Sequence, residues 1–403
     1  MDNDFTSAAH SAMALASEQE LTDVSQLVQT ILSEAFSRNA SDIHFEPYED
    51  FYRIRLRCDG ILYEYLKPNK HLSRKIATRI KVLAELDIAE QRKPQDGRAK
   101  LNLDSSDWID LRVSTLPTLW GEKLVLRLLS SQPVALDTSS LGFTPAQANI
   151  FESALSLAQG MILVTGPTGS GKTVTLYSGL QSINSSEVNI STAEDPIEIN
   201  LAGVNQVQIH QQIGLGFMEA LRAFLRQDPD IIMLGEIRDS DTANAAVKAA
   251  QTGHLVLSTL HTNSASEALQ RLNNMGVASY NIASSISLII AQRLVRRLCP
   301  HCRQIDKNTV YQQDINSSVP QQTLYRANPK GCQHCTQGYR GRIGLFELMN
   351  ITPELSHSIL KQSSARELED LAIKQGMQTL QRSGEHALFS GDTSLQELHR
   401  VLG

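Results

Sequence analysis

The sequence lacks any hydrophobic run that approaches the roughly 20 residues needed to cross a bilayer. No secretory signal is expected, because the acidic start Met1-Asp2-Asn3-Asp4 has no apolar segment behind it. The formal net charge of −6 leaves no excess of basic residues, which argues against nucleic acid as the main partner. We therefore expect a cytoplasmic protein that lies at a membrane only where a partner holds it.

Cysteine is also scarce, with five in 403 residues, yet four of them form two C-x-x-C pairs. In a reducing compartment, paired cysteines favour a metal site over disulfides. Four thiolates suit tetrahedral Zn²⁺ in a closed structural site, although the gap between the pairs is longer than the usual ~15–20 residues. The alternative is four free thiols. The predicted zinc ligands are Cys299, Cys302, Cys332 and Cys335.

Two histidines inside the cysteine pairs and the remaining cysteine are not expected to bind the metal. His301 and His334 lie inside the two pairs, and we do not expect them to be ligands. Cys58 has no partner in the pattern and is expected to be a small buried hydrophobic residue.

One stretch fits the pattern G-x-x-x-x-G-K-[ST] at every fixed position: Gly166-Pro167-Thr168-Gly169-Ser170-Gly171-Lys172-Thr173. The apolar run 161–165 before it indicates a buried strand, and 174–183 after it predicts a helix. This arrangement directs backbone N–H groups and a positive helix end at one point, where phosphates bind. We expect Lys172 to reach the β- and γ-phosphates and the Thr173 hydroxyl to ligate Mg²⁺. A chance glycine turn is the alternative.

A small α+β domain is predicted at residues 24–130, after a flexible arm at 1–23. Apolar residues at helical spacing predict helices at 24–38 and 72–86. Asp59-Gly60 indicates a hairpin turn. Two helices with a meander of strands make an α+β domain. Residues 131–140 contain Pro133 and several serines, and form a predicted linker. Strands are predicted at 41–46, 51–57, 61–66, 98–103, 108–115 and 123–129.

An α/β domain is predicted at residues 141–403, where strand and helix patterns alternate. This order predicts a mostly parallel sheet with helices on both faces, as in RecA-like nucleotide-binding cores. The cysteine segment 291–342 and a helical tail at 351–403 complete the domain. Strands are predicted at 161–165, 188–193, 230–234 and 254–259, and helices at 174–183, 216–227 and 239–251.

Two carboxylates follow apolar strands of this domain. Glu236 comes after the run 230–234 in the form of a Walker B element, and would hold the Mg²⁺ shell or orient water. Glu194 follows another run and is a candidate for polarising the attacking water, because the carboxyl ends of parallel strands meet where ligands bind. An ordinary acid at a strand end is the alternative for each.

Histidines and arginines supply weaker candidates. His254 and His261 bracket an apolar run, and both are expected at sheet ends near the γ-phosphate, with a hydrogen-bonded structural role as the alternative. Arg222 and Arg226 lie four apart on one face of a predicted helix, where a solvated basic face is favoured over anion binding or a subunit contact.

Together these stretches resemble the type II/type IV secretion ATPases, which are hexameric motors, over about residues 25–400. The quoted motifs are Ser41-Asp42-Ile43-His44, Pro94-Gln95-Asp96-Gly97-Arg98, Arg112-Val113-Ser114-Thr115, Gly166–Thr173, Ala193-Glu194-Asp195-Pro196-Ile197-Glu198, Leu225-Arg226-Gln227-Asp228-Pro229-Asp230, Gly235-Glu236-Ile237-Arg238-Asp239 and Thr252-Gly253-His254 with Thr259-Leu260-His261-Thr262.

The resemblance implies a RecA-like ATPase core, a smaller PAS-like N-terminal domain, and ATP with Mg²⁺ at the phosphate loop. It places Glu194 in an acidic box, Glu236 in Walker B, and His254 and His261 in a histidine box. Arg112 and Arg127 look like the N-terminal arginines that approach the nucleotide phosphates in this family.

Within the family, the tetracysteine pattern is similar to the extension and secretion branches. Ser191–Pro196 and Asn200–Gln206 look most like type IV pilus assembly ATPases. This implies a homo-hexamer that drives pilus assembly through an inner-membrane platform protein and is peripheral at that membrane through its partners. A type II secretion ATPase is the alternative. Two alternatives come from other classes of protein. A nucleic-acid translocase would share the RecA-like core but should show a basic stripe. A non-hydrolysing nucleotide switch would keep the phosphate loop but need not keep Glu194 and Glu236.

Overall fold

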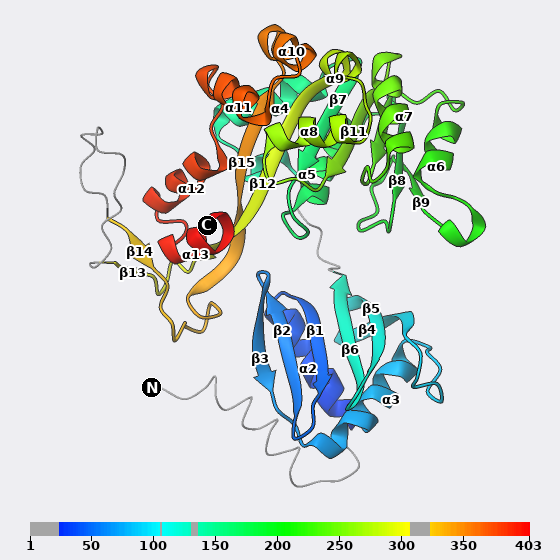
Figure 1. Ribbon diagram of the computed structural model, residues 1–403. Helices are drawn as coiled ribbons and strands as arrows, with labels where there is room; N and C mark the ends of the chain where they lie inside the picture. The colour runs from blue at the N-terminus through cyan, green and yellow to red at the C-terminus, as the bar shows by residue number, and fades with distance from the viewer. Residues whose placement is uncertain (1–23, 105–106, 130–135, 307–322) are drawn as a thin grey trace. The chain divides into compact units, whose positions relative to one another are not determined.

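A computed structural model describes residues 24–104, 107–129, 136–306 and 323–403. The chain divides into two compact units, residues 1–134 and 135–403 (Figure 1). The predicted arm at 1–23 and residues 131–135 of the predicted linker lie outside the described residues. Residues 138–140 of that linker belong to a short 3₁₀ helix, η2 (Thr138–Leu141).

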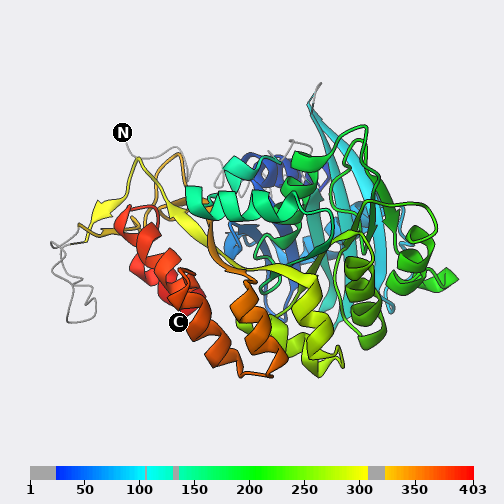
Figure 2. The ribbon, with the colours of Figure 1, turned by 90° about the horizontal axis from the view of Figure 1, so that it is seen from above.

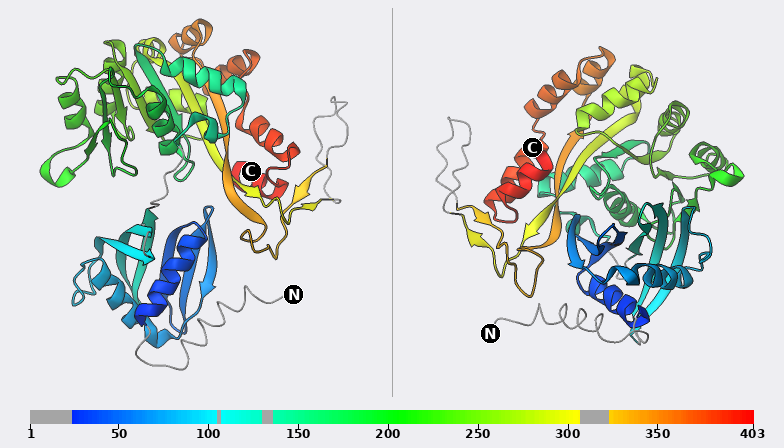
Figure 3. Two further views of the ribbon diagram at one scale, coloured as in Figure 1. Left: turned by 180° about the vertical axis from the view of Figure 1, so that it is seen from behind. Right: turned by 60° about the horizontal axis from the view of Figure 1, so that its bottom comes forward.

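The first unit is a six-stranded antiparallel sheet with two helices on one face (Figure 3). Its helices are α2 (Val24–Ser37) and α3 (Ser73–Leu83), the latter preceded by the 3₁₀ turn η1 (Lys70–Leu72). The strands are β1 (Ala40–Pro47), β2 (Tyr52–Cys58), β3 (Ile61–Leu66), β4 (Gln95–Asp104), β5 (Asp107–Thr118) and β6 (Gly121–Leu129).

The strand order β3-β2-β1-β6-β5-β4 corrects the predicted meander. A meander pairs only consecutive strands, whereas β1 here pairs with both β2 and β6, with Ile43 opposite Leu126. Local alternation fixes which side chains point inward but carries no information about distant partners. The inward side chains, such as Ile43 and Phe45, are fully buried against Ile31 of α2 and Ile76 of α3.

The second unit is built on a seven-stranded sheet in the order β15-β12-β7-β11-β10-β8-β9. All neighbouring strands are parallel except the edge pair β12 and β15. The sheet confirms the predicted mostly parallel arrangement. Its strands are β7 (Gly160–Thr165), β8 (Ile190–Glu194), β9 (Asn205–Gln208), β10 (Ile231–Leu234), β11 (Leu255–Leu260), β12 (Ile286–Leu298) and β15 (Tyr339–Asn350).

Helices cover both faces of this sheet, because alternate residues of β7 enter two different hydrophobic cores. Ile162 and Val164 pack with α4 and α5, whereas Met161 and Leu163 pack with the core formed by α6, α7 and α8. These helices are α4 (Pro145–Leu155), α5 (Lys172–Ile183), α6 (Phe217–Phe224), α7 (Ser240–Gln251) and α8 (Ala265–Asn274). Helix α6 is shorter than the predicted 216–227.

The C-terminal part follows the β12–β15 pair. The helices α12 and α13 contact β15 and β12, respectively (Figure 2). Two short strands, β13 (Gln304–Ile305) and β14 (Tyr325–Arg326), pair beside the cysteines. The remaining elements are η3 (Gln211–Ile213), α9 (Ser279–Ser285), α10 (Pro353–Leu360), α11 (Ala365–Lys374), α12 (Leu380–Phe389) and α13 (Leu395–Leu402). Within the described ranges, no helix combines the length and apolar character that a bilayer crossing requires.

Candidate functional site

The phosphate-loop motif connects β7 to α5 and requires its glycines. At Gly166, where φ is +149°, a β-carbon would lie only 2.5 Å from the Gln292 carbonyl oxygen. Gly171 caps α5 in the left-handed region at φ 89°, and a β-carbon there would lie 2.9 Å from Gln292 Nε2. Gln292, the residue of β12 directly after the stretch that pairs with β7, therefore fixes how closely the loop backbone packs onto the sheet.

Lys172, the first residue of α5, is 9% exposed and folds back onto its own loop. Its Nζ donates to the carbonyl oxygens of Gly166 at 2.8 Å and Pro167 at 3.1 Å. Burial, aided by the nearby Arg293 charge, lowers the pKa of Lys172 to about 8. The buried Lys172 ammonium has only neutral oxygens as hydrogen-bond acceptors here, so an anion in their place would bind it more strongly.

Four neighbouring strands, β7, β11, β10 and β8, end at one edge of the sheet. Their carboxyl ends deliver Lys172, His261, Glu236 and Glu194, in that spatial order, because parallel strands place their ends together. Thr165 ties two of these ends, since its Oγ1 lies 2.7 Å from the Thr262 hydroxyl. The predicted strand-end groups thus form one row at this edge.

Glu236 lies next to His261 and Arg238 in this row. Arg238 donates a hydrogen bond to Glu236 Oε1, and His261 Nε2 lies 3.5 Å from Oε2. The Arg238 guanidinium lowers the pKa of the Glu236 carboxyl in spite of its partial burial. Burial and the Lys172 charge lower the pKa of His261 below its ordinary value, so the imidazole is neutral near pH 7. Glu236 is therefore a carboxylate beside a lysine and a neutral imidazole.

Glu194 is enclosed, with 3% of its surface exposed. Its Oε1 accepts hydrogen bonds from Thr192 Oγ1 at 2.6 Å and Gln206 Nε2 at 3.1 Å, and its Oε2 accepts one from the Tyr177 hydroxyl. Such contacts hold the carboxylate in one orientation at the end of β8.

His254 does not join this row and lies at the opposite edge of the sheet. It precedes β11, and its carbonyl accepts from the N–H of Gly160 at the start of β7. Its Nδ1 lies 3.0 Å from the Ala249 carbonyl oxygen. The residue therefore sits at the amino edge of the sheet, a strand length from the loop, because β7 and β11 run parallel.

The arginines singled out by sequence lie on two different units. Arg112 and Arg127 face one another in register on β5 and β6, on the side of the first unit's sheet away from its helices. Arg127 Nε donates to Asp42 Oδ1 at 3.0 Å. In the second unit, Arg222 and Arg226 are exposed on and just beyond α6, as expected of a solvated basic face.

The four paired cysteines form a compact cluster. Their sulfur atoms all lie within 4.8 Å of one another. The Sγ distances are 3.7 Å for Cys299–Cys332 and 3.6 Å for both Cys302–Cys335 and Cys332–Cys335. A tetrahedron with metal–sulfur bonds of ~2.3 Å has edges of about 3.8 Å, so the donor set fits a metal of zinc's size.

Two histidines near the cluster and the fifth cysteine were also given positions in the sequence analysis. The His301 and His334 ring centroids lie 4.4 Å apart with the rings tilted by 35°, and neither ring belongs to the sulfur set. Cys58 is 3% exposed in the core of the first unit, which confirms its expected burial.

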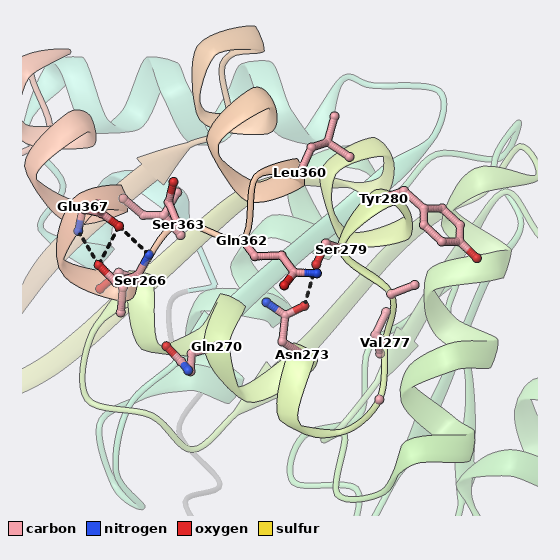
Figure 4. Close-up of a pocket in the computed structure, with 15 residues that line it drawn as sticks. Ser266, Gln270, Asn273, Val277, Ser279, Tyr280, Leu360, Gln362, Ser363 and Glu367 are labelled. Atoms are coloured by element: carbon pink, nitrogen blue, oxygen red, sulfur yellow. Dashed lines mark hydrogen bonds between the residues drawn. The ribbon is translucent and has the colours of Figure 1, made fainter.

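A separate hollow of about 950 Å³ lies among α8, α9 and the α10–α11 turn (Figure 4). Its lining is mostly small polar or amide side chains, including Ser266, Gln270 and Asn273, and Glu367 is the charged residue among the lining residues. With a carboxylate and no cation in its lining, this hollow does not suit a phosphate.

Several residues of the site were not predicted. Gln292 and Arg293 come from a distant part of the chain, and Tyr177 is near the loop in sequence but reveals its role only through its contact with Glu194. Arg293 is 9% exposed and donates to the Asn263 side-chain and backbone oxygens, which holds the loop after His261. Arg238 alone could have been found from sequence, because it lies two residues after Glu236 in a quoted motif.

Comparison with known proteins gives consistent matches. A family model described as type II/IV secretion system protein matches residues 17–400. The chain is 50% identical to the type IV pilus assembly ATPase PilB of Pseudomonas aeruginosa, over 96% of this chain and 69% of that protein. It is 49% identical to PilB of Myxococcus xanthus (93% and 67%) and 44% identical to type II secretion system protein E of Klebsiella pneumoniae (96% and 77%).

Solved structures agree on the fold. The pilus retraction motor PilT with bound ADP is 25% identical with a TM-score of 0.62, over 93% of this chain and 96% of that one. The ATPase DotB of Legionella pneumophila is 21% identical with a TM-score of 0.70, over 96% and 97%, and supports the fold alone.

Proposed function

The chain belongs to the type II/IV secretion system protein family and is an ATP hydrolase, and we propose that it powers type IV pilus assembly. The observation that carries this proposal is the row of Lys172, His261, Glu236 and Glu194 at one sheet edge, in a chain half identical to pilus assembly ATPases. A basic loop with two carboxylates beside it is the equipment of nucleotide hydrolysis.

ATP would bind with its phosphates along the loop 166–173. Lys172 would exchange the carbonyl oxygens of Gly166 and Pro167 for β- and γ-phosphate oxygens. Thr173 and Glu236 would hold Mg²⁺, which supplies charge neutralisation between the phosphates when bound. Glu194 would orient the attacking water, and His261 would lie beside the γ-phosphate without adding charge.

Arg112 and Arg127 would complete the site from the first unit. A guanidinium fork suits phosphate oxygens and remains charged at any working pH. In the proposed homo-hexamer, hydrolysis would change the angle between the units and move an inner-membrane platform protein that adds pilin subunits. The chain would thus be peripheral at the membrane, held there by that partner.

The four-cysteine cluster would hold one structural Zn²⁺. Its sulfur spacing supports this, and all four ligand positions would be filled by protein, which suits a structural rather than catalytic metal. The proposed domains are 24–130 and 141–403, the first PAS-like and the second RecA-like.

A second candidate function is type II secretion, favoured by the 44% identity to a type II secretion system protein E. The test is deletion of the gene in its native host, with surface pili and secreted proteins scored separately. Complementation by the natural gene but not by Glu236→Gln would tie the phenotype to hydrolysis. Loss of secretion with normal pili would refute pilus assembly.

The chemistry has its own test on purified protein. Glu236→Gln keeps the shape and loses the charge, so ATP should still bind while kcat falls by about a hundredfold or more. Arg238→Gln is the matched control, because it removes the partner of Glu236 and leaves the carboxylate. A normal rate for Glu236→Gln would show that the Walker B assignment is wrong.

A further inference from the structure

The Tyr177 side chain is a feature that the proposed mechanism does not use. It projects from α5, the helix that begins at Lys172, and it is fully buried. Its hydroxyl donates to Glu194 Oε2 and accepts the backbone N–H of Glu198 at 3.4 Å. Burial, together with the Glu194 carboxylate, raises the pKa of Tyr177 far above its ordinary value. The phenol therefore stays protonated and remains a donor throughout the working range of pH.

We propose that Tyr177 is a positioning residue that aims the Glu194 carboxylate from the phosphate-loop helix. This inference rests on the proposed role of Glu194 in orienting the attacking water. Thr192 and Gln206 hold Oε1 from the sheet, whereas Tyr177 reaches Oε2 from α5. The helix that carries the phosphate-binding lysine thereby also sets the direction of the carboxylate.

The geometry separates this role from phosphate binding. Tyr177 lies five residues after Lys172, more than one helical turn along α5. Its hydroxyl contacts are Glu194 and Glu198, both at or beyond the end of β8, and none is in the loop 166–173. Removal of the hydroxyl should therefore change turnover much more than nucleotide affinity.

The experiment compares Tyr177→Phe with the matched control Tyr280→Phe, whose ring is 66% exposed on α9. ATP hydrolysis is measured together with binding of a fluorescent ATP analogue and the melting temperature. One hydrogen bond to a charged group predicts a fall of about tenfold in kcat for Tyr177→Phe. The KM for ATP should change less than about twofold, and Tyr280→Phe should match the natural protein.

Rescue of the donor distinguishes positioning from simple stabilisation. Incorporation of 4-aminophenylalanine at position 177 keeps an N–H donor and should recover most of the rate. A merely structural tyrosine would lower the melting temperature, and kcat would then fall only in proportion to the folded fraction.

Two outcomes overturn the inference: a Tyr177→Phe protein with the natural kcat, or one in which 4-aminophenylalanine fails to recover rate while recovering stability. The second comparison decides the matter even if Tyr177→Phe folds poorly. Glu194→Gln tests the underlying role separately. If that variant hydrolyses ATP normally, the proposed role of Glu194 fails; if it is inactive while Tyr177→Phe is normal, only the positioning role of Tyr177 fails.

Discussion

Replacement of Arg127 by alanine should inactivate the enzyme while barely changing its stability. The Arg127 side chain is 57% exposed, and its ion pair with Asp42 spans 3.0 Å. An exposed ion pair is worth at most about 1 kcal/mol. Asp42 also keeps a second cation after the change, because Arg57 Nε lies 3.5 Å from its other oxygen. The free energy of unfolding should therefore fall by about 1 kcal/mol or less.

The expected loss of activity is much larger. An arginine that neutralises charge in a phosphoryl-transfer transition state contributes roughly 10³–10⁵ in rate. At 25 °C that range corresponds to about 4–7 kcal/mol of barrier. The two effects of Arg127→Ala thus differ several-fold in energy, so a single set of purified samples can separate a catalytic role from a structural one.

Arg57→Ala is the matched control, because Arg57 contacts the same Asp42 carboxylate from the opposite neighbouring strand. Both variants remove one cation from one buried acid, so their unfolding free energies should be similar. Steady-state ATP hydrolysis is measured beside chemical denaturation of the same samples. If the two variants lose the same modest activity, or if the rate of Arg127→Ala follows only its folded fraction, the transition-state role is refuted.

Three further predictions concern the second unit. Metal analysis of the natural protein should give about one zinc per chain. Removal of that metal by a chelator, or the substitution Cys302→Ser, should lower the melting temperature. A metal-free protein with an unchanged melting temperature would contradict this. Gly166→Ala should abolish ATP binding because its β-carbon meets the Gln292 carbonyl at 2.5 Å. Gly169→Ala adds only the strain of a side chain at φ +80°, with nothing within 4 Å of its β-carbon, and should retain measurable binding; equal affinities would refute the packing argument. Lys172, with its pKa lowered to about 8, is charged below that pH, so ATP affinity should be flat near pH 7 and fall as pH rises through 8; an affinity constant up to pH 9.5 would contradict it.

The parts of the site that could be predicted from the sequence are those set by short local patterns, namely the phosphate loop and the ends of its neighbouring strands. The loop from Gly166 to Thr173 has a fixed spacing, the strand before Glu236 is a short apolar run, and the strand that ends in Glu194 is short and buried. Parallel pairing then brings their ends together, so three candidates could be placed from local patterns alone. His254 lies at the other edge of the sheet, and an apolar run with a histidine at both ends does not tell which end faces the phosphate loop.

The remaining features depend on contacts between distant segments. Edge strand β15 pairs with β12 across the cysteine segment, and neither its partner nor its direction is visible in its own sequence. Gln292 and Tyr177 read locally as ordinary members of a strand and a helix. Their roles arise only where the loop packs on Gln292 and where Tyr177 meets Glu194 across the core.

Strand β12 connects the phosphate loop to the cysteine cluster, two sites with separate chemical roles. Its residue Gln292 supports the phosphate loop, Arg296 is bound to the fully buried Glu397 of α13, and the first cysteine of the cluster, Cys299, follows its end. From Gln292 to Cys299 an extended chain covers roughly 23 Å. The loop and the cluster are thus held by one strand, which is paired with β15 along most of this length. Loss of the cluster would therefore loosen the far end of the strand on which the phosphate loop packs.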